Sequence, residues 1–231
     1  MSSLHHDGPA FLRLGFIKAE GVRMEAIPSG FESRLEGLLR SRKRGLSEAE
    51  DTWRQSVRDI LRNGTYKPTG RGKPASEYLI RASMEDHFPR INAAVDICNF
   101  MSLYSLLPVS IWDLDKAATT HFKIRLGMEG EEYEFNSVGQ NIDLKDLVVG
   151  CAVSDDRPEG NPIVNPVKDS MATKTSDQTG RVGAIVYARD HDGPTGSLVS
   201  ICELFCDLLS NCGVESVAAF RVVNHRETVR I

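Results

Sequence analysis

The segment INAAVDICNFMSLYSLLPVSIWDLDKA, residues 91–117, holds the most distinctive pattern in the chain. Its apolar residues Ile91, Ala94, Val95 and Cys98 recur at helical spacing, which predicts a helix that Pro89 opens and that runs to residue 105. Further along, Asp113 and Asp115 are expected to fix a turn before the next strand by accepting backbone hydrogen bonds. We interpret Asn92 and Asp96 as residues that cap turns or bond neighbouring loops.

The part of the chain before this segment is predicted to hold one strand and three helices. FLRLGFIKAEGV, from Phe11, is apolar and β-prone and indicates a strand. Residues 29–44 carry apolar side chains at helical spacing and close with basic ones. Ser47 and Glu50 form a capping box that begins a second helix, ended by Gly64. A third helix is expected from Pro74. Its predicted inward-facing residues are Tyr78, Leu79 and Ala82.

Strand patterns dominate the part that follows. Residues 121–126 alternate polar and apolar, and Gly127 and Gly130 are expected to turn the chain into Tyr133 and Phe135 as a hairpin. The runs LVVGCAV (147–153), AIVYARD (184–190) and VESVAAFRVV (214–223) predict three more strands, with a helix over 198–212 before the last. Residues 154–180 are expected to form a long irregular loop, a kind of connection that often carries function.

This mixture of elements predicts an α/β (α+β) fold, in which a mixed β-sheet has helices packed on its faces. Residues 1–65 are interpreted as an N-terminal strand and a basic helical extension packed on the core. Residues 66–231 are interpreted as the main domain. A chain of 231 residues can bury a core of this kind without disulfides or metals.

Composition narrows the possible partners. The net charge of -4 argues against a protein that coats nucleic acid through bulk charge, and no DNA partner is expected. No stretch approaches the roughly 20 apolar residues of a membrane span. The five cysteines match no zinc module and are interpreted as free thiols, which favours a cytoplasmic protein. The P-loop pattern fails because Pro74 follows Gly72-Lys73, and we expect no metal and no cofactor.

Basic residues gather in the first third of this acidic chain. Arg54, Arg58 and Arg62 are four residues apart, so they line one edge of a helix, and a basic loop follows them. Arginine forks match phosphate oxygens, which makes RNA contact one interpretation, and a solvated helix face beside a basic loop is the other. The RNA-binding candidates are Arg54, Arg58, Arg62, Lys67, Arg71 and Lys73.

The segment 91–117 resembles a stretch of bacterial phenylalanyl-tRNA synthetase beta chains, IN-x-VVDVTNY followed by HAFDLDKL. Residues in register with it are Asn92, Val95, Asp96, Asn99, Pro108, Asp113, Leu114, Asp115 and Lys116. The next segment, KIRLGMEGEEYEF, resembles the family's I-x-V-R-x-A-x-x-GE at Arg125 and Gly130-Glu131. The likeness covers roughly residues 70–225. It implies the B3/B4 editing domain, whose family role is to hydrolyse tyrosine wrongly attached to phenylalanine tRNA.

KPTGRGKPASEYLIR and KDSMATKTSDQT (168–179) resemble segments of free-standing members of that family, and nothing here resembles the synthetase's catalytic domain. Two positions depart from the synthetase pattern. Ser110 stands where the family motif has a histidine, and the later strand, near Val186, lacks the family's glutamate. A polar pocket is instead expected if the long loop folds over it. Its candidates are Asn92, Ser110, Asp113, Asp169, Ser170, Thr173 and Thr175.

Two functions follow from this resemblance. In the first, the chain binds aminoacyl-tRNA and hydrolyses a mischarged aminoacyl ester in trans, as an aminoacyl-tRNA deacylase and not as an aminoacylating synthetase. In the second, the chain is a non-catalytic RNA- or amino-acid-binding module that kept the pocket and lost the editing chemistry. In both, the expected partner is tRNA or aminoacyl-tRNA, with the amino-acid moiety in the pocket and no membrane partner.

Overall fold

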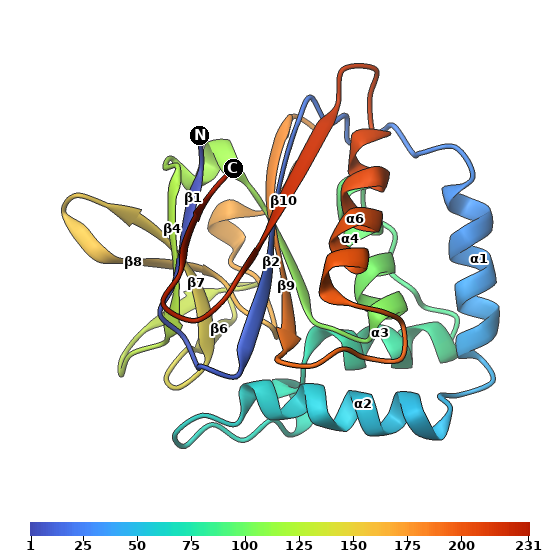
Figure 1. Ribbon diagram of the computed structural model, residues 1–231, viewed down its shortest axis with the longest axis horizontal. Coiled ribbons are helices and arrows are strands. Elements are labelled where there is room, and N and C mark those ends of the chain that lie inside the picture. Colours follow the sequence, from blue (N-terminus) through green and yellow to red (C-terminus); the bar gives the residue numbers. More distant parts are fainter.

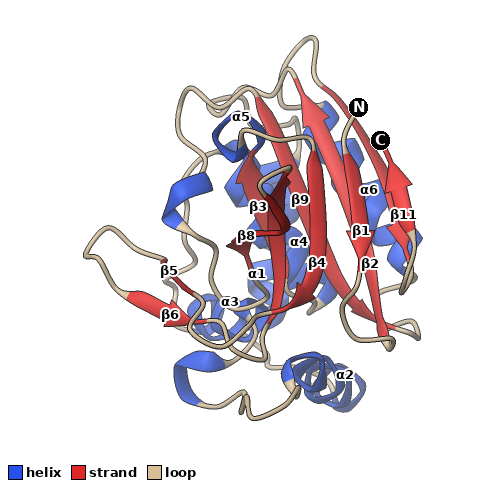
Figure 2. Cartoon of the chain, turned by 90° about the vertical axis from the view of Figure 1, so that its left-hand side faces the viewer, coloured by secondary structure: helices blue, strands red, loops and turns tan.

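A computed structural model describes residues 1–231 and shows two β-sheets packed face to face, with a layer of helices on one side (Figure 1). When the molecule is turned by 90°, the strands of one sheet lie in front of those of the other (Figure 2). The strands are β1 Ser3–His6, β2 Leu12–Glu20, β3 Val109–Asp113, β4 His121–Leu126, β5 Glu132–Glu134, β6 Asn141–Asp143, β7 Val148–Ser154, β8 Arg157–Val164, β9 Arg181–Arg189, β10 Val217–Val223 and β11 Thr228–Arg230.

One sheet has five strands in the order β11-β1-β4-β7-β8, the second has four in the order β10-β2-β9-β3, and β5 and β6 form a small ribbon. The five-stranded sheet is mixed because β1 and β4 run parallel, whereas its other pairs are antiparallel. The predicted fold class is therefore confirmed, although the strands are divided between sheets and the helices cover one face of the four-stranded sheet.

Five of the six helices were predicted, with bounds that differ from the predicted ones by a few residues, and the short helix over residues 114–117 (α5) was not. The helices are α1 Phe31–Arg42, α2 Glu48–Arg58, α3 Ala75–Met84, α4 Ala93–Ser105, α5 Leu114–Ala117 and α6 Leu198–Ser210, with 3-10 turns η1 Asp59–Leu61, η2 Gly70–Gly72 and η3 Met171–Thr173. The Ser47–Glu50 capping box at the start of α2 is present. None of these helices has the length and apolar composition needed to cross a lipid bilayer.

Aromatic side chains join the two sheets. Phe16 of β2 stacks on Trp112 of β3 with ring centroids 6.4 Å apart, and Phe122 of β4 meets both rings from the opposite sheet. All three side chains are buried. Burial of a side chain of this size contributes about 1.5–3 kcal/mol, so this contact is a major part of what holds the sheets together.

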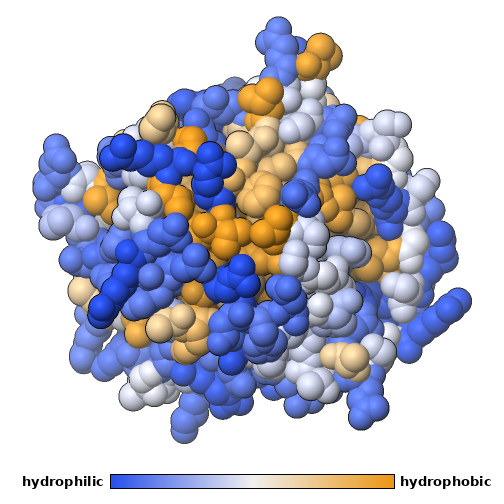
Figure 3. Space-filling model, viewed as in Figure 1, coloured by the Kyte–Doolittle hydropathy of each residue, from blue (hydrophilic) through white to orange (hydrophobic).

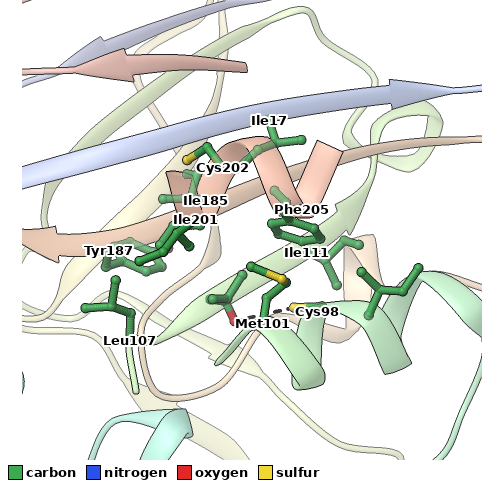
Figure 4. Packing of buried hydrophobic residues seen from close by; sticks show 14 of the residues in the cluster. Ile17, Cys98, Met101, Leu107, Ile111, Ile185, Tyr187, Ile201, Cys202 and Phe205 are labelled. Carbon is green, nitrogen blue, oxygen red and sulfur yellow. Dashed lines mark hydrogen bonds between the residues drawn. The ribbon is translucent and has the colours of Figure 1, made fainter. Parts of the chain in front are cut away.

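The helix layer packs on the opposite face of β2 and β9. Figure 4 shows Phe205 and Ile201 of α6 between the sheet residues and Met101 of α4. Because alternate residues of a strand point to opposite faces, β2 buries Phe16 against one sheet and Ile17 beneath the helices. All five cysteines are buried and free, as the sequence predicted.

The surface that faces the viewer in Figure 1 carries both apolar and hydrophilic residues. Apolar residues gather near its middle, and hydrophilic residues cover most of its periphery (Figure 3). Several large apolar side chains are exposed, as is normal for a folded protein.

Several sequence predictions are corrected by the structure. Tyr78 does not face inward but is 65% exposed, whereas Leu79 and Ala82 are buried as expected. The helix predicted from Pro89 starts at Ala93, because the Asn92 side chain accepts a hydrogen bond from the amide of Val95 and caps it. Ile91 therefore precedes the helix and is 68% exposed, so it does not join the apolar stripe.

The pairing of short strands was also predicted incorrectly. The turn at Gly127 does not return the chain along β4, because β5 pairs with β6, whereas β4 pairs with β1 and β7. The segment 154–180 is not irregular throughout, since it contains β8 and η3. Strands β1, β3 and β11 were not predicted, and β11 follows the strand that was expected to be the last.

The close approach of α6 to β2 gives a stability test. A Cβ atom at Gly15 would overlap the Sγ of Cys202. We expect Gly15→Ala to lower the free energy of unfolding by about 1–3 kcal/mol, because overpacking a core forces atoms apart. Cys202→Ala in the same chain should recover part of that loss. Urea unfolding of the two single variants and the double variant measures the coupling.

The matched control for this test is Gly37→Ala in α1, where an added Cβ meets no atom within 4 Å. It should raise stability by about 0.5–1 kcal/mol, because alanine favours a helix over glycine. Additive effects of Gly15→Ala and Cys202→Ala would contradict the described contact.

Candidate functional site

A cleft of about 870 Å³ opens between α3, the start of α4, β3 and the segment that follows β8. Its buried lining, here called the floor, is largely apolar and comes from several elements. The floor residues are Leu79, Cys98, Val109, Ile111, Asn165 and Val167. A volume of this size suits a small organic group, and an apolar floor with few polar atoms is typical of ligand sites.

Positively charged side chains surround the mouth of the cleft. Four of them form no salt bridge with any carboxylate, and they are called the rim cations: Arg71, Lys73, Lys168 and Lys174. Glu77 also lines the cleft, but its carboxylate already pairs with Arg54 and Arg58 at 3.0 and 2.5 Å. The mouth therefore carries uncompensated positive charge within an acidic protein.

Two of the rim cations are held in place by Phe135. The Nζ of Lys168 lies 3.7 Å from the centroid of the Phe135 ring, a cation–π contact, and the Nζ of Lys174 donates to the Phe135 carbonyl at 3.0 Å. Loss of solvation, followed by the nearby charge of Arg71, lowers the pKa of Lys168. Both causes favour binding of an anion, which would compensate the crowded positive charge.

Asp169 is the acidic group at the base of the cleft. Its Oδ2 accepts a hydrogen bond from the amide of Ile111 at 3.3 Å, whereas its Oδ1 is closed from solvent and has no hydrogen-bond partner. Burial raises the pKa of Asp169 to about 7, and the neighbouring polar groups oppose this effect only in part. A carboxyl with such a pKa changes its charge near neutral pH.

A polar network lies directly behind Asp169. The hydroxyl of Tyr187 donates to the Ser110 hydroxyl at 3.3 Å, and Ser110 donates to the carbonyl of Asn165 at 3.1 Å. The Asn165 amide donates to the hydroxyl of Tyr133 at 2.6 Å, and that hydroxyl donates to the carbonyl of Lys168 at 2.6 Å. These bonds fix the positions of Asn165 and Lys168, and through them the cleft wall.

Of the seven predicted pocket residues, Asp169 lines the cleft and the other six do not. Ser110 is buried in the polar network, and Asn92 donates to the hydroxyl of Thr175 at 3.3 Å. Asp113 caps α5 and accepts from Thr179 at 2.5 Å. Ser170 caps η3, and the hydroxyl of buried Thr173 has no partner.

The predicted RNA-binding residues form two groups, with Lys67 outside both. Arg71 and Lys73 line the cleft and are exposed. Arg54 and Arg58 pair with Glu77, Arg62 pairs with Asp59, and these arginines share a shallow hollow of about 410 Å³. Lys67 is exposed. RNA contact by these residues stays a prediction.

Sequence reasoning did not select Lys168, Lys174 or Asn165 as site residues, although Lys168 and Lys174 flank selected ones. The positive charge of Lys168 and Lys174 within the segment 168–179 was the sequence signal that could have identified those two residues. No group of three or more histidine, cysteine, aspartate or glutamate side chains is arranged to hold a metal ion.

The fold and cleft thus define an α/β domain with a ligand-sized site whose mouth is basic. Residues 67–191, more than half of the chain, match the family model described as the B3/4 domain, and this range contains all residues that line the cleft. The chain is also similar to the phenylalanine–tRNA ligase beta subunit of Streptococcus pneumoniae, with 28% identity over 110 residues. That match covers 47% of this chain and 13% of the relative's length. The protein belongs to the B3/4 domain family, as the sequence resemblance indicated.

The raised pKa of Asp169 gives a test of the site. Between about pH 4 and pH 7 the folded protein holds a proton that the unfolded chain releases, so Asp169 should lower stability as the pH rises through this window. We expect Asp169→Asn to become more stable relative to the unsubstituted protein from pH 4 to pH 8. Urea unfolding across that range measures the difference.

Asp155→Asn, in the exposed turn after β7, is the matched control and should give a difference that does not change with pH in this way. A constant difference for Asp169→Asn as well would contradict a buried carboxyl with a pKa near 7.

Proposed function

We propose that this chain binds aminoacyl-tRNA and takes the aminoacylated 3′ end into the cleft, acting as a free-standing protein of the cytoplasm. The observation that carries the proposal is the set of four rim cations above an apolar floor. Membership of the B3/4 domain family supports a role related to a tRNA synthetase.

The charge arrangement suits a nucleic-acid end more than a long RNA surface. Phosphate groups are attracted to lysine and arginine side chains, and each contact releases counterions from the RNA. Here the unpaired cations converge on one opening, whereas Arg54 and Arg58 are engaged by Glu77. The exposed ring of Tyr78 lines the same opening, and aromatic rings are common stacking platforms for unpaired bases. These features support binding of a single-stranded terminus.

Hydrolysis of a mischarged ester in trans is the first form of the proposal. It is supported by the editing role that the family resemblance implies. The alternative form, binding without hydrolysis, is favoured by Ser110, which stands at the family's histidine position. Its hydroxyl is buried and engaged by Asn165 and Tyr187, so it does not line the cleft.

Replacing two rim cations tests the binding site. We expect Arg71→Ala/Lys73→Ala to weaken tRNA binding about 10-fold or more and to reduce the salt dependence of log Kd by about one to two units of slope, because two phosphate contacts are lost. Filter binding at several salt concentrations measures both quantities.

The matched control is Arg221→Ala/Arg230→Ala on β10 and β11, which removes the same charge outside the cleft. Equal weakening by the two double variants would show that binding follows net charge and would contradict a site at the cleft.

A deacylation assay separates the two forms. Incubation with Tyr-, Ser- and Ala-charged tRNAs should release the amino acid from at least one of them faster than the buffer control, and Arg71→Ala/Lys73→Ala should slow that release. Retained binding without release on any of the three would reject the hydrolytic form and leave the binding module.

A further inference from the structure

Three acids whose carboxylates are largely shielded differ in how their oxygens are used: Asp96 and Asp113 are buried, and Asp169 is half-buried with its Oδ1 closed from solvent. Asp96 accepts from the Arg90 guanidinium at 2.6 Å and from the Ile91 amide at 2.7 Å. Asp113 accepts from two amides at the start of α5 and from the Thr179 hydroxyl. Each of these carboxylates therefore has a structural task, and both of its oxygens have partners.

Asp169 has no comparable set of partners. One weak amide bond reaches its Oδ2, its Oδ1 has none, and no lysine or arginine forms a salt bridge with it. The charge of Lys174 influences it, yet the Nζ of Lys174 donates to the Phe135 carbonyl. A buried carboxyl without a counterion is unfavourable, and a protein retains one at a cost to stability.

We propose that Asp169 binds the free α-ammonium group of the aminoacyl moiety at the base of the cleft. This inference rests on the proposed function, because it assigns one end of the same ligand. The carboxylate would gain the charge-assisted partner that the free protein does not supply, and the apolar floor would strengthen the attraction by excluding water.

The distribution of charge in the cleft points to a ligand with two oppositely charged ends. The rim cations offer contacts to a phosphate, and the Asp169 carboxyl, which contacts the floor residue Ile111, offers one to an ammonium. An aminoacyl ester on a terminal nucleotide carries both groups. An N-acylated or peptidyl ester lacks the ammonium, so the same carboxyl would discriminate against it.

The groups that face Asp169 do not mask its charge. They are Cys98 on α4, Tyr133 on β5, Tyr187 on β9 and Lys174 after η3. Burial raises the pKa values of Cys98, Tyr133 and Tyr187 well above their ordinary values, so these three groups are neutral at pH 6–8. Over that range Asp169 is therefore the group near the floor whose charge changes, since burial raises its pKa to about 7.

Amino-acid amides are suitable probes because they carry the ammonium without a carboxylate or a nucleotide. We would titrate the full chain with the amides of alanine, serine, tyrosine and phenylalanine and with their N-acetylated counterparts, following the protein by NMR. At pH 7.5, where more than half of the α-amino groups (pKa about 7.7–8.0) are protonated, at least one amide should bind saturably, about 10-fold or more tightly than its acetylated counterpart, the ratio expected for a charge-assisted hydrogen bond. Binding of that amide should weaken from pH 7.5 to pH 6, because Asp169 gains a proton over this range while the amide stays largely protonated.

Asp169→Asn should reduce the preference for the amide to about one and remove its pH dependence, and Asp155→Asn should leave both unchanged. Equal binding of amide and acetylated amide, a preference that persists in Asp169→Asn, or no saturable binding of any amide would overturn the inference. Binding of uncharged tRNA through the rim cations should be the same in Asp169→Asn. If the unsubstituted protein binds tRNA but shows no preference for the amide, this inference alone is rejected, whereas absent tRNA binding rejects the proposed function.

Discussion

The antiparallel pairing of β2 with β9 is the interaction on which the rest of the structure depends. It joins nine residue pairs, from Leu12 with Arg189 to Glu20 with Arg181. The two strands are far apart in the sequence, so this pairing brings distant segments of the chain together. β9 then pairs with β3 and sets Ser110 opposite Ile185, which fixes Val109 and Ile111 in the floor of the cleft. A shift of one residue in this register would exchange the two faces of the strands and dismantle the floor.

The charge of the cleft depends on which of its acidic and basic side chains already have partners within the protein. Glu77 is held by two arginines of α2, so it does not neutralise the cations at the mouth. At the base, the polar network of Ser110, Asn165 and Tyr133 satisfies its own members and leaves one oxygen of Asp169 unbonded. The positive mouth and the acidic base are therefore properties of the surrounding scaffold, as much as of the residues that line the cleft.

Local sequence signals predicted much of the fold and a smaller part of the site. The Ser47–Glu50 capping box and the alternation in β4 depend on neighbours in sequence, so they could be identified directly. The pairing of β5 with β6, and the placement of Ser110 behind the cleft, depend on contacts between distant segments that periodicity does not report. Asp169 was predicted as a pocket residue because it is polar and lies in a long segment. That its Oδ1 lacks a hydrogen-bond partner depends on contacts with distant segments, so the sequence does not reveal it.

The central claim is that one ligand spans the cleft with its phosphate at the mouth and its amine at the base. A crystal structure of the protein with a non-hydrolysable 3′-aminoacylamino-adenosine 5′-phosphate would test it most directly. The account predicts the phosphate within contact distance of at least two rim cations and the α-ammonium within hydrogen-bond distance of Asp169. Analogue bound outside the cleft, or bound with its amine at the mouth, would contradict it.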